Sequence, residues 1–158
     1  MTPAPKTRRS MFLWLTLVAV LVLGAVLIVS LGLTVDDWSR DLSTNHATTL
    51  EGHADPGLRP LWLVETPEQI AVRLEQVVGK LPRWKVESRA DTPDGVDYHL
   101  VRTTLLWKFA DDVRVSIRRE GNRSVVRAES RSRVGKGDLG QNPRNLRELL
   151  DTLRAPTP

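Results

Sequence analysis

An uncharged apolar run near the N-terminus limits what this chain can fold into more than any other feature. Residues 11–33, MFLWLTLVAVLVLGAVLIVSLGL, contain no charged residue, proline, asparagine or glutamine. As an α-helix rising 1.5 Å per residue, the run is about 35 Å long, which is enough to cross a hydrocarbon core of about 30 Å. It is apolar around its whole circumference, as contact with lipid requires. The sequence therefore predicts a transmembrane helix over residues 11–33.

Two interpretations of this helix compete: a secretory signal that is removed, or an anchor that is retained. The apolar regions of signals are 7–15 residues long and end at small residues in an Ala-x-Ala-like pattern. The run here is longer, and the following VSLGLTVDD offers no such pair of small residues. This comparison favours a retained single-pass anchor.

The charges on either side of the run predict its orientation. Three cations, Lys6, Arg8 and Arg9, precede it, whereas three acidic residues and one arginine follow it: Asp36, Asp37, Arg40 and Asp41. Cytoplasmic flanks carry the excess of lysine and arginine. We therefore expect residues 1–10 to form a cytoplasmic tail and everything after residue 34 to lie outside the cytoplasm.

That division changes the meaning of the net charge. The chain has a net charge of +4 and a pI near 10.0, values that are typical of nucleic-acid-binding proteins. Three of its 23 basic residues and none of its 19 acidic residues lie in the tail, so the exported part is nearly neutral. Charge and compartment both argue against a nucleic-acid partner. The absence of cysteine excludes disulfides, thiol catalysis and thiolate metal sites.

The exported part divides into an irregular segment and a domain. Residues 34–60 are polar and lack a clean periodicity, which is typical of a stalk or of a segment wrapped against the domain. Residues 61–155 form the domain, and its first helix begins at the capping box Thr66-Pro67-Glu68-Gln69. Its apolar face follows the helical period and consists of Ile70, Leu74, Val77, Val78 and Leu81.

After this helix the apolar period changes from that of a helix to that of a strand. Four segments read as strands, and short connections that include Pro93-Asp94-Gly95, Ala110-Asp111-Asp112 and Gly121-Asn122 separate them. Asn142-Pro143 then caps a last helix with a leucine stripe. The predicted fold is α+β: a transmembrane helix followed by a four-stranded antiparallel sheet flanked by two helices. The four strand segments are 83–90, 96–109, 113–120 and 123–134.

A glycine-rich stretch, GKGDLG at residues 135–140, matches the spacing of the dinucleotide-binding fingerprint. That fingerprint works only when it opens the helix of a βαβ unit, with an acidic residue about 20 positions further on. Only 18 residues follow Gly140, and the preceding strand belongs to a meander. We expect no nucleotide, and we interpret Gly135, Gly137 and Gly140 as a structural turn from strand to helix.

The last third of the chain resembles a known family. FADDVRVSI and SVVRAESRSRVGKGDLGQNPRNLRELL are similar to segments of the domain of unknown function 1499, and DLSTN and DPGLRPL resemble its upstream segments more loosely. The paired cysteines of some members are absent. The resemblance implies a domain identity and no activity. The motif residues that carry it are Phe109, Asp111, Asp112, Ser132, Arg133, Gly135, Asp138, Gly140 and Asn142.

Four residues near the glycine turn are candidate ligand-binding residues: Arg131, Arg133, Asp138 and Asn142. The guanidinium groups, together with the backbone N–H groups of the turn and of the last helix, form a candidate anion site. Lipid head groups, an acidic envelope polymer or another membrane protein would be its partner. The alternative is a solvated sheet face with ion pairs across strands, and a turn in which Asp138 accepts backbone hydrogen bonds.

No motif of a known enzyme or metal site accompanies these residues. The chain has no G-x-S-x-G elbow, H-E-x-x-H helix or Walker loop. We read Asp111 and Asp112 as turn formers and place no metal at His46 and His53, whose spacing fits no zinc site. We therefore expect a non-catalytic binding or envelope-associated module without a cofactor. The alternative is a hydrolase or transferase that acts on envelope material around Arg133 and Asp138.

Overall fold

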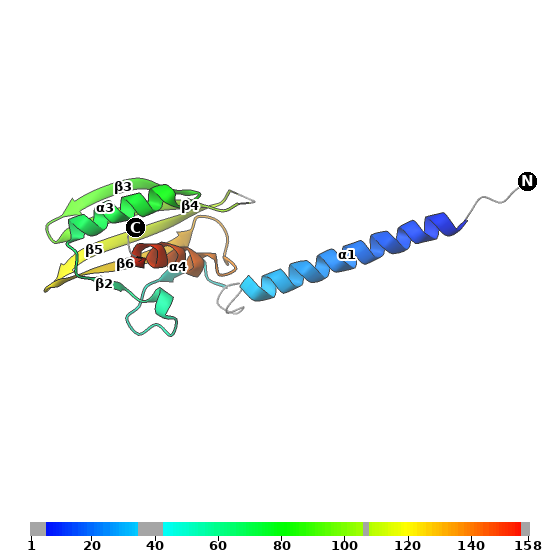
Figure 1. Cartoon of the computed structure of the whole chain (residues 1–158), viewed down its shortest axis with the longest axis horizontal. Helices are drawn as coiled ribbons and strands as arrows, with labels where there is room; N and C mark the ends of the chain where they lie inside the picture. Colours follow the sequence, from blue (N-terminus) through cyan, green and yellow to red (C-terminus); the bar gives the residue numbers. More distant parts are fainter. Residues whose placement is uncertain (1–5, 35–42, 106–107, 156–158) are drawn as a thin grey trace, which may run out of the picture. The chain divides into compact units, whose positions relative to one another are not determined.

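A computed structural model describes residues 6–34, 43–105 and 108–155 of the chain (Figure 1). It divides into two compact units, Met1–Asp36 and Asp37–Pro158. The first unit contains helix α1, Lys6–Thr34, whose segment Met11–Ser30 has a mean hydropathy of 2.9 and is long enough to cross a membrane. Its length and composition suit a membrane anchor and a signal sequence alike. Residues 1–5 of the predicted tail and the charges that follow the run, from Asp36 to Asp41, lie outside the described residues.

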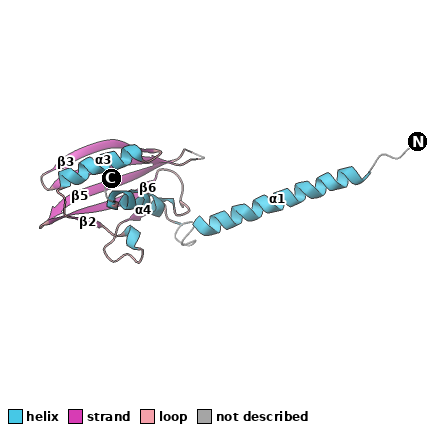
Figure 2. Ribbon diagram, in the orientation of Figure 1, coloured by secondary structure: helices cyan, strands magenta, loops and turns pink. Residues whose placement is uncertain are grey.

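The second unit is an antiparallel sheet with two helices (Figure 2). The strand order is β1-β6-β5-β4-β3, and β2 also pairs with β6. Helices α3, Pro67–Lys80, and α4, Gln141–Arg154, lie over the same face of the sheet, and a short 3-10 helix, η1, spans Pro56–Leu58. The strands are β1 His46–Thr48, β2 Leu61–Leu63, β3 Trp84–Thr92, β4 Gly95–Thr103, β5 Ala110–Glu120 and β6 Arg123–Ser132.

The α+β class and the antiparallel meander of β3 to β6 are confirmed, but the sheet has six strands rather than the predicted four. The additional strands β1 and β2 both pair with β6, at opposite ends of it: Ala47 faces Ser130, whereas Trp62 faces Val125. Each additional strand has three residues, which is too short for an alternating pattern to stand out. β1 and η1 both lie within the segment 34–60.

Two predicted boundaries also move. β4 ends at Thr103, and Ala110 to Asp112, predicted as a connection, form the beginning of β5. α4 begins at Gln141, so Pro143 lies inside its first turn and Asn142 is not the cap. β6, which precedes the glycine turn, runs antiparallel to β1, β2 and β5. The glycine turn therefore does not follow a strand of a βαβ unit.

The core lies between the helices and the sheet. The predicted capping box of α3 is present: Thr66 Oγ1 accepts from Gln69 N, and Gln69 Oε1 accepts from Thr66 N. The helix then buries Ile70, Leu74 and Val78 against the strands. A fully buried leucine or isoleucine stabilises a fold by about 1.5–3 kcal/mol. The leucines of α4 that are completely buried are Leu146, Leu149, Leu150 and Leu153.

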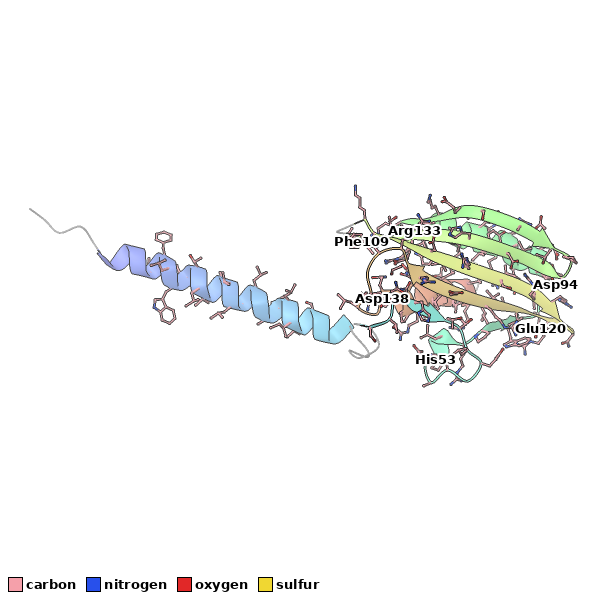
Figure 3. The ribbon with its side chains drawn as sticks, turned by 180° about the vertical axis from the view of Figure 1, so that it is seen from behind. His53, Asp94, Phe109, Glu120, Arg133 and Asp138 are labelled. Carbon is pink, nitrogen blue, oxygen red and sulfur yellow. The ribbon has the colours of Figure 1, made fainter. Side chains whose placement is uncertain are left out.

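Within the second unit, no described helix lies over the other face of the sheet (Figure 3). Because side chains alternate along a strand, Val113 and Val115 of β5 point to the helices, while Asp112 and Arg114 point to the opposite side. We call this second side the open face. A residue of the sheet therefore faces either the core beneath the helices or the open face, depending on its position along the strand.

Candidate functional site

The residues that carry the family resemblance gather at one end of the second unit. β4 and β6 end here, and β5 and α4 begin here. Figure 3 shows Phe109, Arg133 and Asp138 at this end, and Asp94 and Glu120 at the opposite end. We call it the loop end, because the β4–β5 and β6–α4 connections form it.

A cavity of about 510 Å³ opens at the loop end. Thr104, Leu105 and Phe109 of the β4–β5 connection line one wall, and residues of the β6–α4 connection line the other. Five of the nine motif residues line it: Phe109, Asp111, Ser132, Gly135 and Asp138. The remaining lining residues are Thr104, Leu105, Val134, Gly137, Leu139, Gln141 and Arg144.

Four of the residues that line this cavity are apolar and exposed. Their exposed fractions are 72% for Leu105, 46% for Phe109, 57% for Val134 and 40% for Leu139. Single exposed apolar residues are common, but a group of four around one cavity is typical of an interaction surface. We call these four residues the apolar rim.

The floor beneath the cavity is a buried hydrogen-bond network. Asp111 is 1% exposed, and Ser130, Asn142 and Asn145 are completely buried. Asn145 Nδ2 donates to Asp111 Oδ2 at 2.9 Å and to Ser130 Oγ at 3.1 Å. Ser130 Oγ donates to Asn142 Oδ1 at 2.6 Å. The network therefore links β5, β6 and α4 through side chains that have partners in the protein, which is the condition under which buried polar groups are tolerated.

Asp138 closes this network and caps α4. Its Oδ1 accepts from Gly140 N at 2.9 Å, and its Oδ2 accepts from Asn142 N at 2.8 Å. It also accepts a short hydrogen bond from Asn142 Nδ2. The positive end of α4 therefore already has an anion, the Asp138 carboxylate. Asp138 therefore accepts the backbone hydrogen bonds expected of a turn residue, and ligand binding by Asp138 stays a prediction.

The glycine turn has the backbone that such a connection requires. Gly135 and Gly140 have φ of +97° and +74°, and Leu139 between them has φ of +52°. Glycine adopts these angles without the steric cost that a Cβ imposes. Gly137 is not among the glycines with positive φ. Gly135 and Gly140 therefore let β6 leave the sheet and return as α4.

Arg133 lies on the other side of the loop end, where it binds Asp112. Its Nε and Nη2 contact the Asp112 carboxylate at 2.7–3.1 Å, and His99 Nε2 lies 2.7 Å from Asp112 Oδ1. The hydrogen bonds from Arg133 lower the pKa of Asp112 to about 2; burial opposes this shift and His99 adds to it. The candidate ligand residues thus form two groups: Asp138, which lines the cavity, with its partner Asn142, and Arg131 with Arg133 towards the open face.

The open face carries a second concavity, of about 590 Å³. Two of its arginines are paired: Arg118 Nη2 lies 2.7 Å from Asp97 Oδ2, and Arg127 Nη1 lies 2.7 Å from Glu120 Oε1. Arg114, which also lines it, and the nearby Arg131 are exposed and have no hydrogen-bond or ion-pair partner among the described residues.

The metal and acid–base candidates of the sequence do not come together. Asp111 and Asp112 point to opposite faces of β5, so their carboxylates cannot share an ion. His46 and His53 border a cavity of about 190 Å³, but His53 Nδ1 accepts from Asp55 N. Within residues 6–34, 43–105 and 108–155, no three such side chains form a metal-binding group, and no serine hydroxyl forms a hydrogen bond with His99.

Sequence reasoning named Asn142 and Asp111 but missed Ser130 and Asn145, the other two members of the buried network. Ser130 is in the same register as Val126 and Ala128, which face the core, so alternation alone marks it as buried. Asn142 and Asn145 likewise lie on the α4 face that carries Leu146 and Leu149. The signal that could have revealed the network is the presence of polar residues at positions that the periodicity marks as buried. The apolar rim had no such signal, because it forms only when two distant loops meet.

The fold defines an α+β domain in which two helices cover one face of an antiparallel sheet. A cavity opens at one end of this domain, beside a buried network of polar side chains. A family model described as "Protein of unknown function (DUF1499)" matches residues 37–153. The match covers most of the chain, so the protein belongs to this family, as the motif residues predicted. No curated protein and no solved structure matches the chain.

Proposed function

We propose that this protein is a single-pass membrane protein whose family domain lies outside the cytoplasm and acts as a non-catalytic binding module. The apolar segment Met11–Ser30 of α1 supports the anchor, and the cations that precede this segment support a cytoplasmic N-terminus. The near-neutral charge and the absence of cysteine suit many compartments, so orientation rests on the flanking charges alone.

The cavity at the loop end carries the proposed binding role. Its rim is apolar, whereas exposed Lys108 and Lys136 lie in the two connections that form its walls. Arg144 Nη2 donates to Leu139 O at the same wall. Concave sites with apolar linings and a few fixed polar groups are the usual form of small-ligand sites. The chemistry fits an amphipathic anion, with its apolar part against the rim and its head group near the lysines, as in an anionic phospholipid.

The alternative, a hydrolase or transferase around Arg133 and Asp138, has less support. Arg133 does not line the cavity, and its guanidinium already binds Asp112. The oxygens of Asp138 accept from two backbone N–H groups and from Asn142. General acid–base catalysis needs a group that is free to exchange a proton with the substrate. Because the polar groups of Arg133 and Asp138 already have partners in the protein, a binding role has more support than a catalytic one.

A titration with a water-soluble phospholipid tests the proposal. Among the described residues, the buried hydrophobic core lies between Leu58 and Leu153, and Ala47 packs against it. A fragment of residues 43–158, checked for folding by circular dichroism, therefore contains this core and avoids detergent. Leu139 has positive φ, which asparagine tolerates. We expect dihexanoyl phosphatidylglycerol to bind, and Leu139→Asn to weaken binding by about tenfold because apolar contact is lost.

The matched control is Val64→Asn, since Val64 is 79% exposed and follows β2 at the opposite end of β6. This variant should bind like the unchanged fragment. The proposal fails if the unchanged fragment does not bind, or if both variants weaken binding equally.

A second candidate function is the binding of an acidic envelope polymer on the open face. The observation that favours it is that Arg114 and Arg131 are exposed and unpaired among the described residues. Arginine forks bind carboxylates and phosphates in a bidentate manner. If this face is the site, Arg131→Gln abolishes the retention of the fragment on a polyanion column, whereas Lys80→Gln, which removes a charge from the helix side, does not. Equal retention of both variants excludes a specific role for Arg131.

A further inference from the structure

We propose that the apolar rim, Leu105, Phe109, Val134 and Leu139, docks on the surface of the bilayer that α1 crosses, so that the cavity takes its ligand from the membrane. This inference rests on the proposed function, because it requires α1 to be a retained anchor. It goes beyond the proposed function in two respects: the rim contacts the bilayer, and the ligand enters the cavity from the membrane.

The point at which the chain joins the domain supports this partner. Asn45 is bound to the loop end by three hydrogen bonds. Its Nδ2 donates to Gly135 O at 2.9 Å, and its carbonyl oxygen accepts from Ser132 N at 3.0 Å and from Asn142 Nδ2 at 2.7 Å. The membrane helix ends at Thr34. The chain is therefore attached at the loop end, which also carries the rim, and not at the opposite end of the sheet.

The length of chain between these residues keeps the rim close to the membrane. Eleven steps from Thr34 to Asn45 span at most about 40 Å when fully extended. A short connection of this kind gives the domain an effective concentration in the millimolar range at the membrane surface. A contact too weak to hold a free protein is then sufficient to keep the rim on the bilayer.

The charges around the rim match an anionic lipid surface. The β4–β5 connection, residues 104–109, contains Lys108 and no acidic residue. In the β6–α4 connection Lys136 is exposed, and the single carboxylate, Asp138, is held by its hydrogen bonds to the start of α4. Apolar side chains beside lysines are typical of surfaces that enter the head-group region. The opposite end carries the acidic residues Asp94 and Glu120 (Figure 3).

The absence of cysteine makes a direct test possible in the full chain. Single variants Leu105→Cys, Val134→Cys and Val64→Cys replace exposed apolar side chains, the last at the opposite end. Each is labelled with an environment-sensitive fluorophore and placed, one copy per disc, in nanodiscs of phosphatidylcholine and phosphatidylglycerol that contain nitroxide-labelled lipid. One copy per disc excludes a second copy as the occupant of the rim.

We expect the labels at positions 105 and 134 to be quenched at least twofold more than the label at position 64. Replacing both Lys108 and Lys136 by glutamine should reduce that difference in discs with phosphatidylglycerol. Equal quenching at all three positions overturns membrane docking, and leaves a protein segment as the occupant of the rim.

Retention of the protein in membranes after an alkaline carbonate wash separates this inference from the proposed function. Loss of the protein in the wash contradicts the anchor, and with it both proposals. Retention in the wash together with equal quenching contradicts docking alone.

Discussion

The side-chain nitrogen Nδ2 of Asn142 donates a hydrogen bond to the carbonyl oxygen of Asn45, 97 residues earlier in the chain, at 2.7 Å. Asn45 immediately precedes β1, and Asn142 lies in the first turn of α4. One buried amide thus joins the beginning of the domain to its last helix. The same amide contacts Ser130, Ser132 and Asp138, so it holds together the floor of the cavity.

We expect Asn142→Ala to lower the free energy of unfolding by about 2–3 kcal/mol, because several buried groups lose their partner at once. Chemical denaturation measures this change. Asn122→Ala, in the exposed β5–β6 turn, is the control and should alter stability by no more than about 0.5 kcal/mol. Equal stability of the two variants would contradict a structural role for the network.

The glycine turn gives a second prediction. Because Gly140 has φ of +74°, Gly140→Ala should lower the free energy of unfolding by about 1 kcal/mol or more. Gly137 is not among the glycines with positive φ, so Gly137→Ala should cost less than Gly140→Ala. Thermal unfolding of the two variants side by side measures the difference. If Gly140→Ala unfolds like the unchanged protein, the turn does not require glycine.

The lowered pKa of Asp112 predicts that the free energy of unfolding depends on pH. Arg133 lowers the pKa of this carboxyl from its usual 3.8 to about 2 in the folded protein. A lowered pKa in the folded state stabilises the fold above pH 4, and this contribution is lost as the pH falls from about 4 to 2. Since Arg133 is half-exposed, the contribution is about 1 kcal/mol.

Asp112→Asn should therefore lower the free energy of unfolding at pH 7, and the difference from the unchanged protein should shrink as the pH falls from 4 to 2. Urea denaturation at several pH values measures it. Asp94→Asn is the control, because its side chain is 64% exposed in the turn before β4. A difference that persists unchanged at pH 2 would show that the Asp112 charge is not its source.

Much of the fold followed from local patterns. The capping box at Thr66 and Gln69 and the alternation in β5 and β6 are each encoded within a few residues, and both appear in the structure. β1 and β2 were missed because three-residue strands carry no period, and their pairing with β6 is a tertiary effect. The connection assigned to Asp111 was wrong for a related reason: two adjacent aspartates suggest a turn, but Asn145 satisfies Asp111 inside the core.

The site was harder to predict than the fold. The sequence placed Arg131, Arg133, Asp138 and Asn142 in one candidate group because they lie within twelve positions. The direction of a side chain, however, depends on its position along β6 and on the backbone conformation of the connection that follows. Asp138 turns back to cap α4, while Arg133 crosses to Asp112. The apolar rim combines loops about 25 residues apart, and only the folded sheet brings Leu105 and Val134 to one cavity.

A map of amide chemical shifts in the fragment of residues 43–158, recorded as dihexanoyl phosphatidylglycerol is added, tests the binding-module account most directly. The account predicts that the largest changes lie in the walls of the cavity, from Val134 to Gln141 and at Leu105 and Phe109, and that they saturate. Changes centred on Arg114 and Arg131 of the open face, or no saturable change at all, would contradict it.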